Sequence, residues 1–242
     1  MYGWRGRIGL IVPSTNSVCE AELHRMLPEG VSLHTARMFN PVVKTEKEKE
    51  EALVAMSQEA ERAARELASV EPRVIIFACT SGSFIKGPGY DRQVGERIQK
   101  ASGVPGVATS TAVIEALKAF NLKKIVLASP YNQRIGEKEK IFFESVIPGL
   151  KILRDKHLGL LNAIEKGYLT PDVAYRTARE IDLPEAEGIF ISCTDFRTID
   201  IIETLEADTG KPVISSNQAS LWMALKGIGA APLKGYGSLF GK

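Results

Sequence analysis

The sequence has 242 residues, of which 44% are hydrophobic and 25% are charged, and its 31 basic and 29 acidic residues give a formal net charge of +2. This balance is typical of a globular protein and excludes a disordered chain, and no basic stripe interleaved with aromatic residues indicates a nucleic-acid surface. Because the start of the chain lacks the apolar core of a signal peptide and no apolar run is long enough to span a membrane, we expect a cytoplasmic protein without nucleic-acid or membrane partners.

Short runs of apolar and β-branched residues alternate with helical patterns along the chain. The expected strands are residues 8–12, 31–35, 74–77, 125–127, 151–153, 188–191 and 213–214. Strands that alternate with helices in this way predict an α/β protein with largely parallel sheets.

Several of the expected helices have recognisable ends. Thr45 and Glu48 match a capping box and begin a long helix, so the charged run "KTEKEKEEA" is interpreted as its solvated first turns. The buried face of this helix is expected to carry Leu53, Met56, Ala60, Ala63, Ala64 and Leu67. Asn121 is expected to end the helix over residues 111–120 in a left-handed conformation. Further along, Thr170 precedes Pro171 at another expected helix start.

Three landmarks occur twice, in the same order and at similar separation. "IVPS" near the start is similar to "ASPY" at 128–131, and Cys79 and Cys193 each follow an apolar strand and precede a threonine. The segment "GVPGVATSTAVIEAL" is similar to "GKPVISSNQASLWMAL" in the same way. Chance similarity between α/β units is the alternative, but three ordered landmarks favour an internal duplication.

The duplication predicts two similar lobes. Residues 1–112 are expected to form the first lobe, joined by the C-terminal helix in 217–242, and residues 113–216 the second. If so, the strands that end in Cys79 and Cys193 point their carboxyl ends at one crevice, where open α/β sheets bind ligands.

The cysteines are the main candidates for chemistry. Three widely spaced cysteines argue against a disulfide framework and favour reduced thiols. Two thiols on opposite faces of a small molecule could take and return a proton, or one could attack carbon while the other delivers a proton. Either thiol needs a pKa below about 8.5, and the hydroxyl-rich tails after Cys79 and Cys193 suggest helix N-termini that would lower it. Cys19, in a helical stretch, is interpreted as an inert buried thiol.

Four motifs in order resemble a known family. "GLIVPSTN", "ACTSGSF", "SPYN", and "SCTDFRTID" followed by "TGKPVISSNQASLWMAL" are similar to the cofactor-independent Asp/Glu racemase superfamily, especially the branch with maleate cis-trans isomerases and arylmalonate decarboxylases. The resemblance covers nearly the whole chain. It implies an α/β fold of two pseudosymmetric lobes, each with a mainly parallel sheet flanked by helices. It also implies an active site between the lobes, no metal or pyridoxal phosphate cofactor, and a homodimer or larger homo-oligomer.

The resemblance also implies roles for single residues. Cys79 and Cys193 match the catalytic cysteine pair of the family. Thr80, Ser81 and Tyr131 match positions that hydrogen-bond a substrate carboxylate, although Tyr131 could instead be an aromatic residue between the lobes.

Further substrate contacts are implied for Thr194, through its amide or hydroxyl, and for Asn16 and Asn162, which match carboxylate-binding asparagines. Residues 14–16 could instead cap the following helix, and residues 215–217 are interpreted as the cap of the last helix.

The reaction is predicted from the complete cysteine pair. Arylmalonate decarboxylases resemble this chain at "SCT" but carry glycine where it has Cys79, so the pair favours isomerisation of maleate, or a related small dicarboxylate, to fumarate. An arylmalonate decarboxylase-like enzyme, an Asp/Glu-type racemase and a dicarboxylate-binding sensor are the alternatives. Asp195 and Arg197, and the polar "TSGSF", depart from the isomerase pattern and could mark another subgroup, such as the ectoine-utilisation proteins.

Other ligand classes lack sequence support. No complete nucleotide-binding glycine motif is present, and His24, His34 and His157 are scattered without a second ligand at metal-site spacing.

Overall fold

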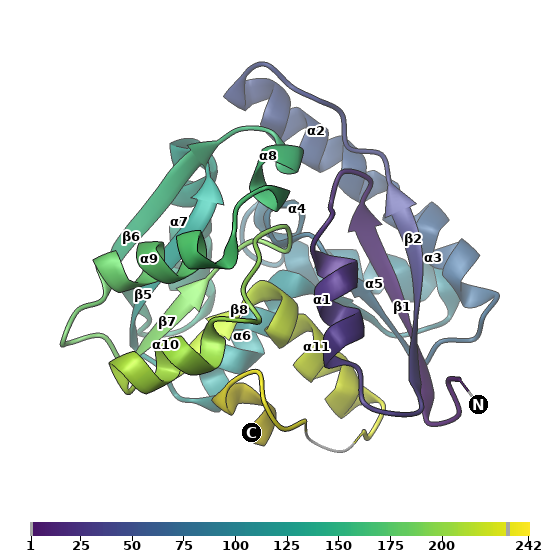
Figure 1. Ribbon diagram of the computed structural model, residues 1–242. Helices are drawn as coiled ribbons and strands as arrows, with labels where there is room; N and C mark the ends of the chain where they lie inside the picture. The colour runs from purple at the N-terminus through teal and green to yellow at the C-terminus, as the bar shows by residue number, and fades with distance from the viewer. Residues whose placement is uncertain (1, 231–232) are drawn as a thin grey trace.

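The computed structural model describes residues 2–230 and 233–242, which contain two parallel four-stranded sheets side by side (Figure 1). The first sheet has the order β2-β1-β3-β4, formed by β1 (Gly6–Pro13), β2 (Val31–Met38), β3 (Val74–Phe77) and β4 (Gly106–Ala108). The second has the order β6-β5-β7-β8, formed by β5 (Lys124–Tyr131), β6 (Lys151–Leu160), β7 (Gly188–Ile191) and β8 (Val213–Ser215). The identical strand order confirms the predicted α/β fold with two similar halves.

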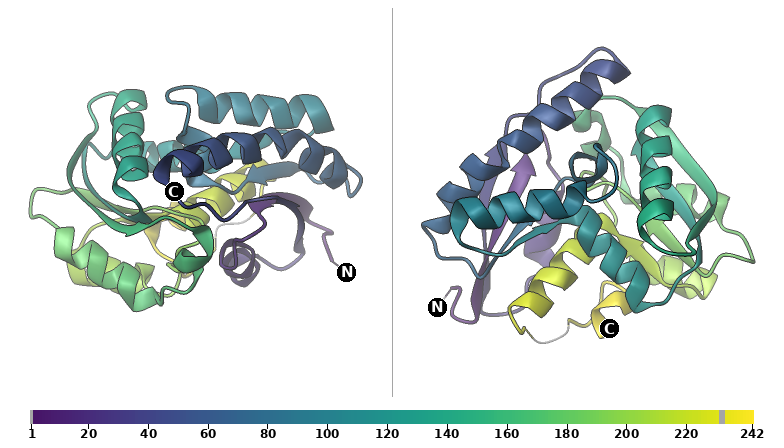
Figure 2. Two further views of the ribbon diagram at one scale, coloured as in Figure 1. Left: turned by 90° about the horizontal axis from the view of Figure 1, so that it is seen from above. Right: turned by 180° about the vertical axis from the view of Figure 1, so that it is seen from behind.

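Helices cover both faces of each sheet, with α3 and α5 on one face of the first sheet and α1 on the other (Figure 2). The helices of the first half are α1 (Cys19–Met26), α2 (Glu46–Gln58), α3 (Ala60–Ala68), α4 (Thr80–Phe84), α5 (Tyr90–Ser102) and α6 (Thr109–Ala119). Those that follow are α7 (Gln133–Val146), α8 (Ala163–Gly167), α9 (Pro171–Ile181), α10 (Ile202–Thr209) and α11 (Ser216–Gly227), with a short 3₁₀ helix at Ser238–Gly241. Both faces of β3 and β7 are therefore buried, as their continuous apolar sequences require.

Helices α6 and α11 pack against each other, and each contacts strands of both sheets. The hydroxyl of Ser220 on α11 donates to the hydroxyl of Thr109 on α6 at 3.1 Å. These two helices belong to one of the three repeated landmarks of the predicted duplication, and they lie between the sheets (Figure 1).

The predicted lobe boundary at residue 112 falls inside α6, and residues 231–232 of the predicted C-terminal segment lie outside the described residues. The lobe boundaries therefore stay a prediction. No helix in the described part of the chain is both long and apolar enough to cross a membrane.

The expected strands are all present, and most extend further than their apolar cores. The sequence prediction missed β4, because a three-residue strand that starts with glycine gives no recognisable run.

The predicted ends of several helices are confirmed. Pro171 is the first residue of α9, and Asn121 is left-handed, with a φ of 53°. The hydroxyl of Thr45 accepts from the amide of Glu48 at 3.2 Å, but the Glu48 carboxylate accepts from Lys44 rather than from Thr45, so only half of the capping box forms.

The long helix expected after Thr45 breaks at Glu59 into α2 and α3. Its predicted apolar face is buried throughout both segments.

Candidate active site

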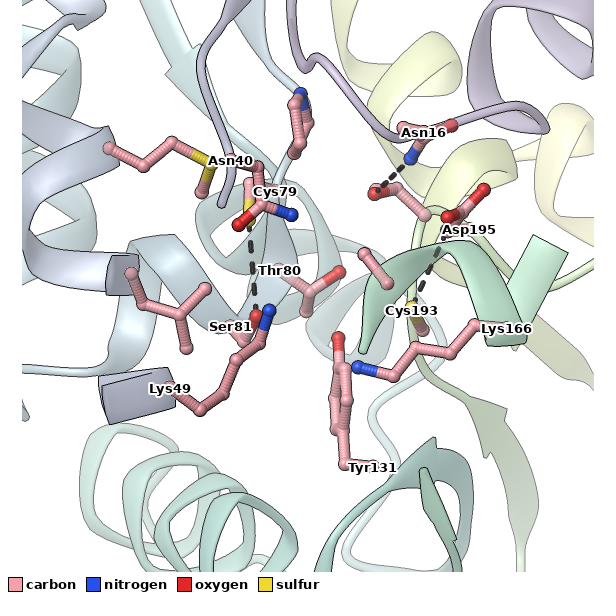
Figure 3. Close-up of a pocket in the computed structure, with 15 residues that line it drawn as sticks. Asn16, Asn40, Lys49, Cys79, Thr80, Ser81, Tyr131, Lys166, Cys193 and Asp195 are labelled. Carbon is pink, nitrogen blue, oxygen red and sulfur yellow. Dashed lines mark hydrogen bonds between the residues drawn. The ribbon is translucent and has the colours of Figure 1, made fainter. Parts of the chain in front are cut away.

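One pocket lies where the carboxyl ends of β1, β3, β5 and β7 meet (Figure 3). Its cavity volume is about 30 Å³, so only a very small ligand could enter without movement of the lining side chains. Its lining residues are Pro13, Asn16, Asn40, Lys49, Leu53, Met56, Cys79, Thr80, Ser81, Tyr131, Ala163, Lys166, Cys193, Thr194 and Asp195. Every site residue predicted from the sequence is among them except Asn162.

Cys79 follows β3 and is the N-cap of α4. Its Sγ accepts from the amide of Gly82 at 3.3 Å and lies 3.9 Å from the Ser81 hydroxyl oxygen. A Cβ at position 82 would lie only 2.9 Å from this sulfur, so glycine is needed for the thiol to reach the helix N-terminus. The expected helix start after this cysteine is thus confirmed.

Cys193 follows β7 in a different local structure. Its φ of 98° is in the left-handed region, which is uncommon for a residue with a side chain. Its amide donates to the hydroxyl of Ser216 at 3.1 Å, and its Sγ accepts from the amide of Asp195 at 3.4 Å.

The helix start expected directly after Cys193 is wrong, because α10 begins only at Ile202. The amides of Thr198 and Ile199 instead donate to the buried carboxylate of Glu22, at 2.7 and 3.3 Å, and this holds the segment as a loop.

Burial raises the pKa of both thiols, contrary to the lowering expected from the sequence. For Cys79 the effect of burial is opposed by the Gly82 amide, the Ser81 hydroxyl and the charge of Lys49. Burial raises the pKa of Cys193 to about 12, and the nearby Asp195 carboxylate adds to the rise. The two thiols therefore have different surroundings, and burial favours the protonated form of Cys193.

Hydroxyl and amide groups surround the two thiols and join the two halves of the fold. The Thr80 hydroxyl donates to that of Ser216 at 3.0 Å, and the Thr194 hydroxyl donates to the carbonyl of Ala78 at 3.1 Å. Tyr131 is buried at the end of β5, and its ring lies edge-on to Phe84 with centroids 6.5 Å apart. A small ligand in this pocket would meet hydroxyl groups from both sheets.

Asn16 caps the following helix and also lines the pocket, and its contact with a substrate stays a prediction. Its Oδ1 accepts from the amides of Val18 and Cys19, at 3.0 and 2.9 Å, as a helix cap does. Its Nδ2 donates to the Thr194 hydroxyl at 3.1 Å while the residue lines the pocket. Cys19 is fully buried outside the pocket, in agreement with an inert thiol.

Asn162 lies beside the pocket. Its Oδ1 accepts from the amide of Val43 at 3.0 Å, which links the segment before α2 to the start of α8. A substrate contact by Asn162 stays a prediction.

The sequence prediction missed the positively charged residues of the pocket. Lys49 was placed in a solvated helical turn, but only 4% of it is exposed, because it shares the inner face of α2 with Leu53 and Met56. Spacing of four and seven residues on one helical face is the signal that could have found it. Lys166 on α8 is equally buried, and its Nζ lies 4.9 Å from the centroid of the Tyr131 ring.

The charged groups of the pocket have shifted pKa values because they are buried. Burial, and then the charge of Lys166, lowers the pKa of Lys49 to about 8, and burial also lowers the pKa of Lys166. Burial raises the pKa of Asp195 to about 6, although its carboxylate accepts from the amide of Ser17 at 2.9 Å. Such shifts in a pocket are typical of functional sites.

Among residues 2–230 and 233–242, no group of three or more histidine, cysteine, aspartate and glutamate side chains could hold a metal ion. His157 instead contacts Ser129 at 2.7 Å and Asp155 at 3.1 Å. This resembles a hydrolytic triad, but Ser129 is fully buried and does not line the pocket, so the three residues have a structural role.

Comparison with known proteins agrees with this geometry. The chain is 28% identical over 232 residues to the maleate isomerase of Nocardia farcinica, covering 92% of this chain and 90% of that protein. It is 28% identical over 238 residues to the arylmalonate decarboxylase of Bordetella bronchiseptica, covering 96% and 95%.

A solved structure similar to this one is a mutant of the Nocardia farcinica maleate cis-trans isomerase with a covalently bound succinylcysteine intermediate. The TM-score is 0.88 at 27% identity, and the match covers 97% of this chain and 98% of that one. The resemblance inferred from the sequence motifs is therefore confirmed. The family model for arylmalonate decarboxylase matches residues 8–240, and this chain belongs to the arylmalonate decarboxylase family.

Proposed function

We propose that this protein catalyses the cis-trans isomerisation of maleate, or of a related small dicarboxylate, through a covalent adduct with Cys79. The observation that carries the proposal is the placement of two thiols, from equivalent strand ends of the two halves, in one pocket with hydroxyl donors. A maleate isomerase and an isomerase structure with a succinylcysteine intermediate among its relatives support the same chemistry.

The reaction begins when the thiolate of Cys79 adds to one carbon of the double bond. The electron pair moves onto the neighbouring carbon and its carboxylate, which forms an enediolate held by the hydroxyls of Thr80, Ser81 and Tyr131. Cys193 then gives its proton to that carbon. The former double bond is now single and can rotate.

Return of the same proton to Cys193 and departure of Cys79 as a thiolate regenerate the enzyme and release fumarate. No atom or electron is gained or lost over the cycle, so the reaction needs no external oxidant or reductant.

The surroundings of the two thiols support this division of roles. A nucleophilic thiolate is favoured by donors and positive charge, and Cys79 has the Gly82 amide and the Lys49 ammonium nearby. A proton donor must stay protonated until it is needed, and burial raises the pKa of Cys193 to about 12 although the charge of Lys166 opposes the rise.

Decarboxylation of an arylmalonate is the second candidate, supported by the family model and by the Bordetella bronchiseptica relative. That reaction needs one proton donor, which Cys193 could provide. Loss of carbon dioxide is favoured where the departing carboxylate sits in a dry, apolar region. The pocket walls here carry Asn40, Lys49 and Lys166, so isomerisation is the better fit.

The proposal can be tested by incubating the protein in deuterated water with maleate, aspartate, glutamate and phenylmalonate in separate samples. NMR would follow isomers, enantiomers and deuterium incorporation, and carbon dioxide would be measured alongside. We expect fumarate from maleate and negligible carbon dioxide from phenylmalonate. Rapid carbon dioxide release with maleate untouched would promote the decarboxylase, and binding of maleate without turnover would promote a sensor.

A further inference from the structure

Two buried lysines face each other in the pocket from different parts of the chain. Lys49 is on α2, beside the first sheet, and Lys166 is on α8, which follows β6 of the second sheet. Only 4% of each residue is exposed, and both line the cavity between the thiols. Figure 3 shows their ammonium groups pointing toward one another across the pocket, with Ser81 close to Lys49 and Tyr131 close to Lys166.

Neither ammonium group forms an ion pair within 4.0 Å with a carboxylate of the described residues. Taking a charged group out of water costs several kcal/mol unless a partner of opposite charge replaces the water. Here two like charges are buried together, so each raises the cost of the other.

The one carboxylate in the pocket lining, Asp195, offsets only part of this cost. Asp195 lies on the far side of Cys193, and its Oδ1 accepts from the amide of Ser17. While both thiols are protonated, the lining side chains of the pocket therefore carry two ammonium groups and one carboxylate, an excess of one positive charge.

We propose that Lys49 and Lys166 form a two-lysine anion site that selects ligands with two separate negative charges, each lysine pairing with one carboxylate of a small dianion. This inference rests on the proposed function only for which carbons of the bound dianion react; binding of the dianion by the two lysines does not depend on the reaction. The two-lysine site explains why both lysines are kept buried at a cost to folding, and why they approach from opposite sides.

The site also narrows the substrate class. A four- or five-carbon dicarboxylate with one carboxylate at each end can place a charge near both ammonium groups. An arylmalonate has both carboxylates on one carbon, so it cannot present one negative charge at each end of an open chain. The pocket therefore fits open-chain dianions.

Stabilisation of the thiolates is another use that two lysines could have, so binding must be measured without the nucleophilic thiol. The Cys79→Ser protein serves as the parent, because it lacks that thiol and does not turn over its ligand. Calorimetry would measure its affinity for succinate and for monomethyl succinate, which has the same carbon chain and one charge less.

We expect succinate to bind at least about 10-fold more tightly than its monomethyl ester, since a charge-assisted hydrogen bond is lost with the second carboxylate. Lys49→Met and Lys166→Met in the same parent should each weaken succinate binding about 10- to 100-fold and bring the ratio of the two affinities toward one. Lys47→Met is the matched control, because Lys47 is on the same helix with its side chain exposed. It should leave both affinities unchanged.

The methionine variants should also melt at a higher temperature than the parent without ligand, because they remove a buried charge. Lys49→Gln and Lys166→Gln provide the same comparison if a methionine variant folds poorly. A succinate-to-ester ratio near one in the parent, no detectable succinate binding, or a ratio that neither substitution changes would overturn the two-lysine site.

Failure of the reaction would look different. Intact selectivity for succinate in the Cys79→Ser protein, with no maleate turnover by the unmutated protein, would refute the isomerase and leave the anion site standing. Maleate turnover by the unmutated protein, without a preference of the Cys79→Ser protein for succinate over its monomethyl ester, would refute the anion site and leave the isomerase standing.

Discussion

The burial of Glu139 predicts that the stability of the folded protein falls as the pH rises above 4.5. Glu139 is fully buried on α7, where its Oε1 accepts from the hydroxyl of Ser192, the residue before Cys193. Its Oε2 has no hydrogen-bond partner among the described groups. Burial raises the pKa of Glu139 from its ordinary value of 4.5 to about 8, so the carboxyl group stays protonated at neutral pH.

The sign of the effect follows from proton binding. Between pH 4.5 and 8 the folded protein holds a proton on Glu139 that the unfolded chain has released. The contribution of this proton to the free energy of unfolding is complete below pH 4.5. It falls by about 1.4 kcal/mol per pH unit as the pH rises toward 8 and is lost above that pH. From pH 5 to pH 8 the loss is roughly 4 kcal/mol, a large part of the stability of a typical domain.

Glu139→Gln removes this dependence, because glutamine is neutral at every pH and keeps an oxygen that can accept from Ser192. Urea unfolding of both proteins from pH 5 to pH 9 would measure it. We expect equal stability at pH 5 and a variant more stable by roughly 4 kcal/mol at pH 8. Glu137→Gln is the control, since Glu137 is exposed two residues earlier on α7. If the free energies of unfolding of wild type and Glu139→Gln changed in parallel from pH 5 to pH 9, the raised pKa of Glu139 would be refuted.

Three further predictions concern the active site. Cys79→Ser and Cys193→Ser should each abolish maleate turnover, whereas Cys19→Ser should keep a near-normal rate and melt at a lower temperature; a wild-type rate in either of the first two would refute the two-thiol mechanism. Gly82→Ala should slow both turnover and alkylation of Cys79 at least about 10-fold, because the added Cβ would lie 2.9 Å from the sulfur. Gly227→Ala, where a Cβ meets no atom within 4 Å, should leave both rates unchanged, and equal effects of the two substitutions would contradict the contact. Chelators should not affect the isomerisation rate, because the described residues form no metal-ligand cluster, and activity restored by added zinc or manganese would disprove this.

Much of the fold could be predicted from the sequence because its signals are local. Apolar runs mark the strands, and the repeated strand-cysteine-threonine pattern predicted two similar halves whose strand ends meet. Predicted pocket residues lie at the ends of such strands: Tyr131 is the last residue of β5, and Cys79 and Cys193 come two residues after β3 and β7 end. Their position depends on the strand alone, so no knowledge of distant contacts was needed.

The lysines could not be found in this way. Lys49 is in a strongly charged run, where a solvated position is the usual outcome, and only the packing of α2 over the pocket buries it. The loop after Cys193 was missed for a similar reason, since Glu22 from another part of the chain binds its amides. Glu139 was missed as well, because its burial follows from the packing of α7 and not from its neighbours in sequence.

The packing of α6 against α11 has a consequence for how a ligand reaches the pocket. Each of these helices contacts both sheets, and buried hydrogen bonds, such as those from Thr194 to Ala78 and from Thr80 to Ser216, link the two halves near the thiols. Rotation of one half against the other would therefore break many contacts at once. Opening the site by a hinge between the halves would therefore require a large free energy. The bond between Val43 and Asn162 joins only the segment before α2 to the start of α8. We therefore expect a ligand to enter through local movement of these two segments rather than through separation of the two halves.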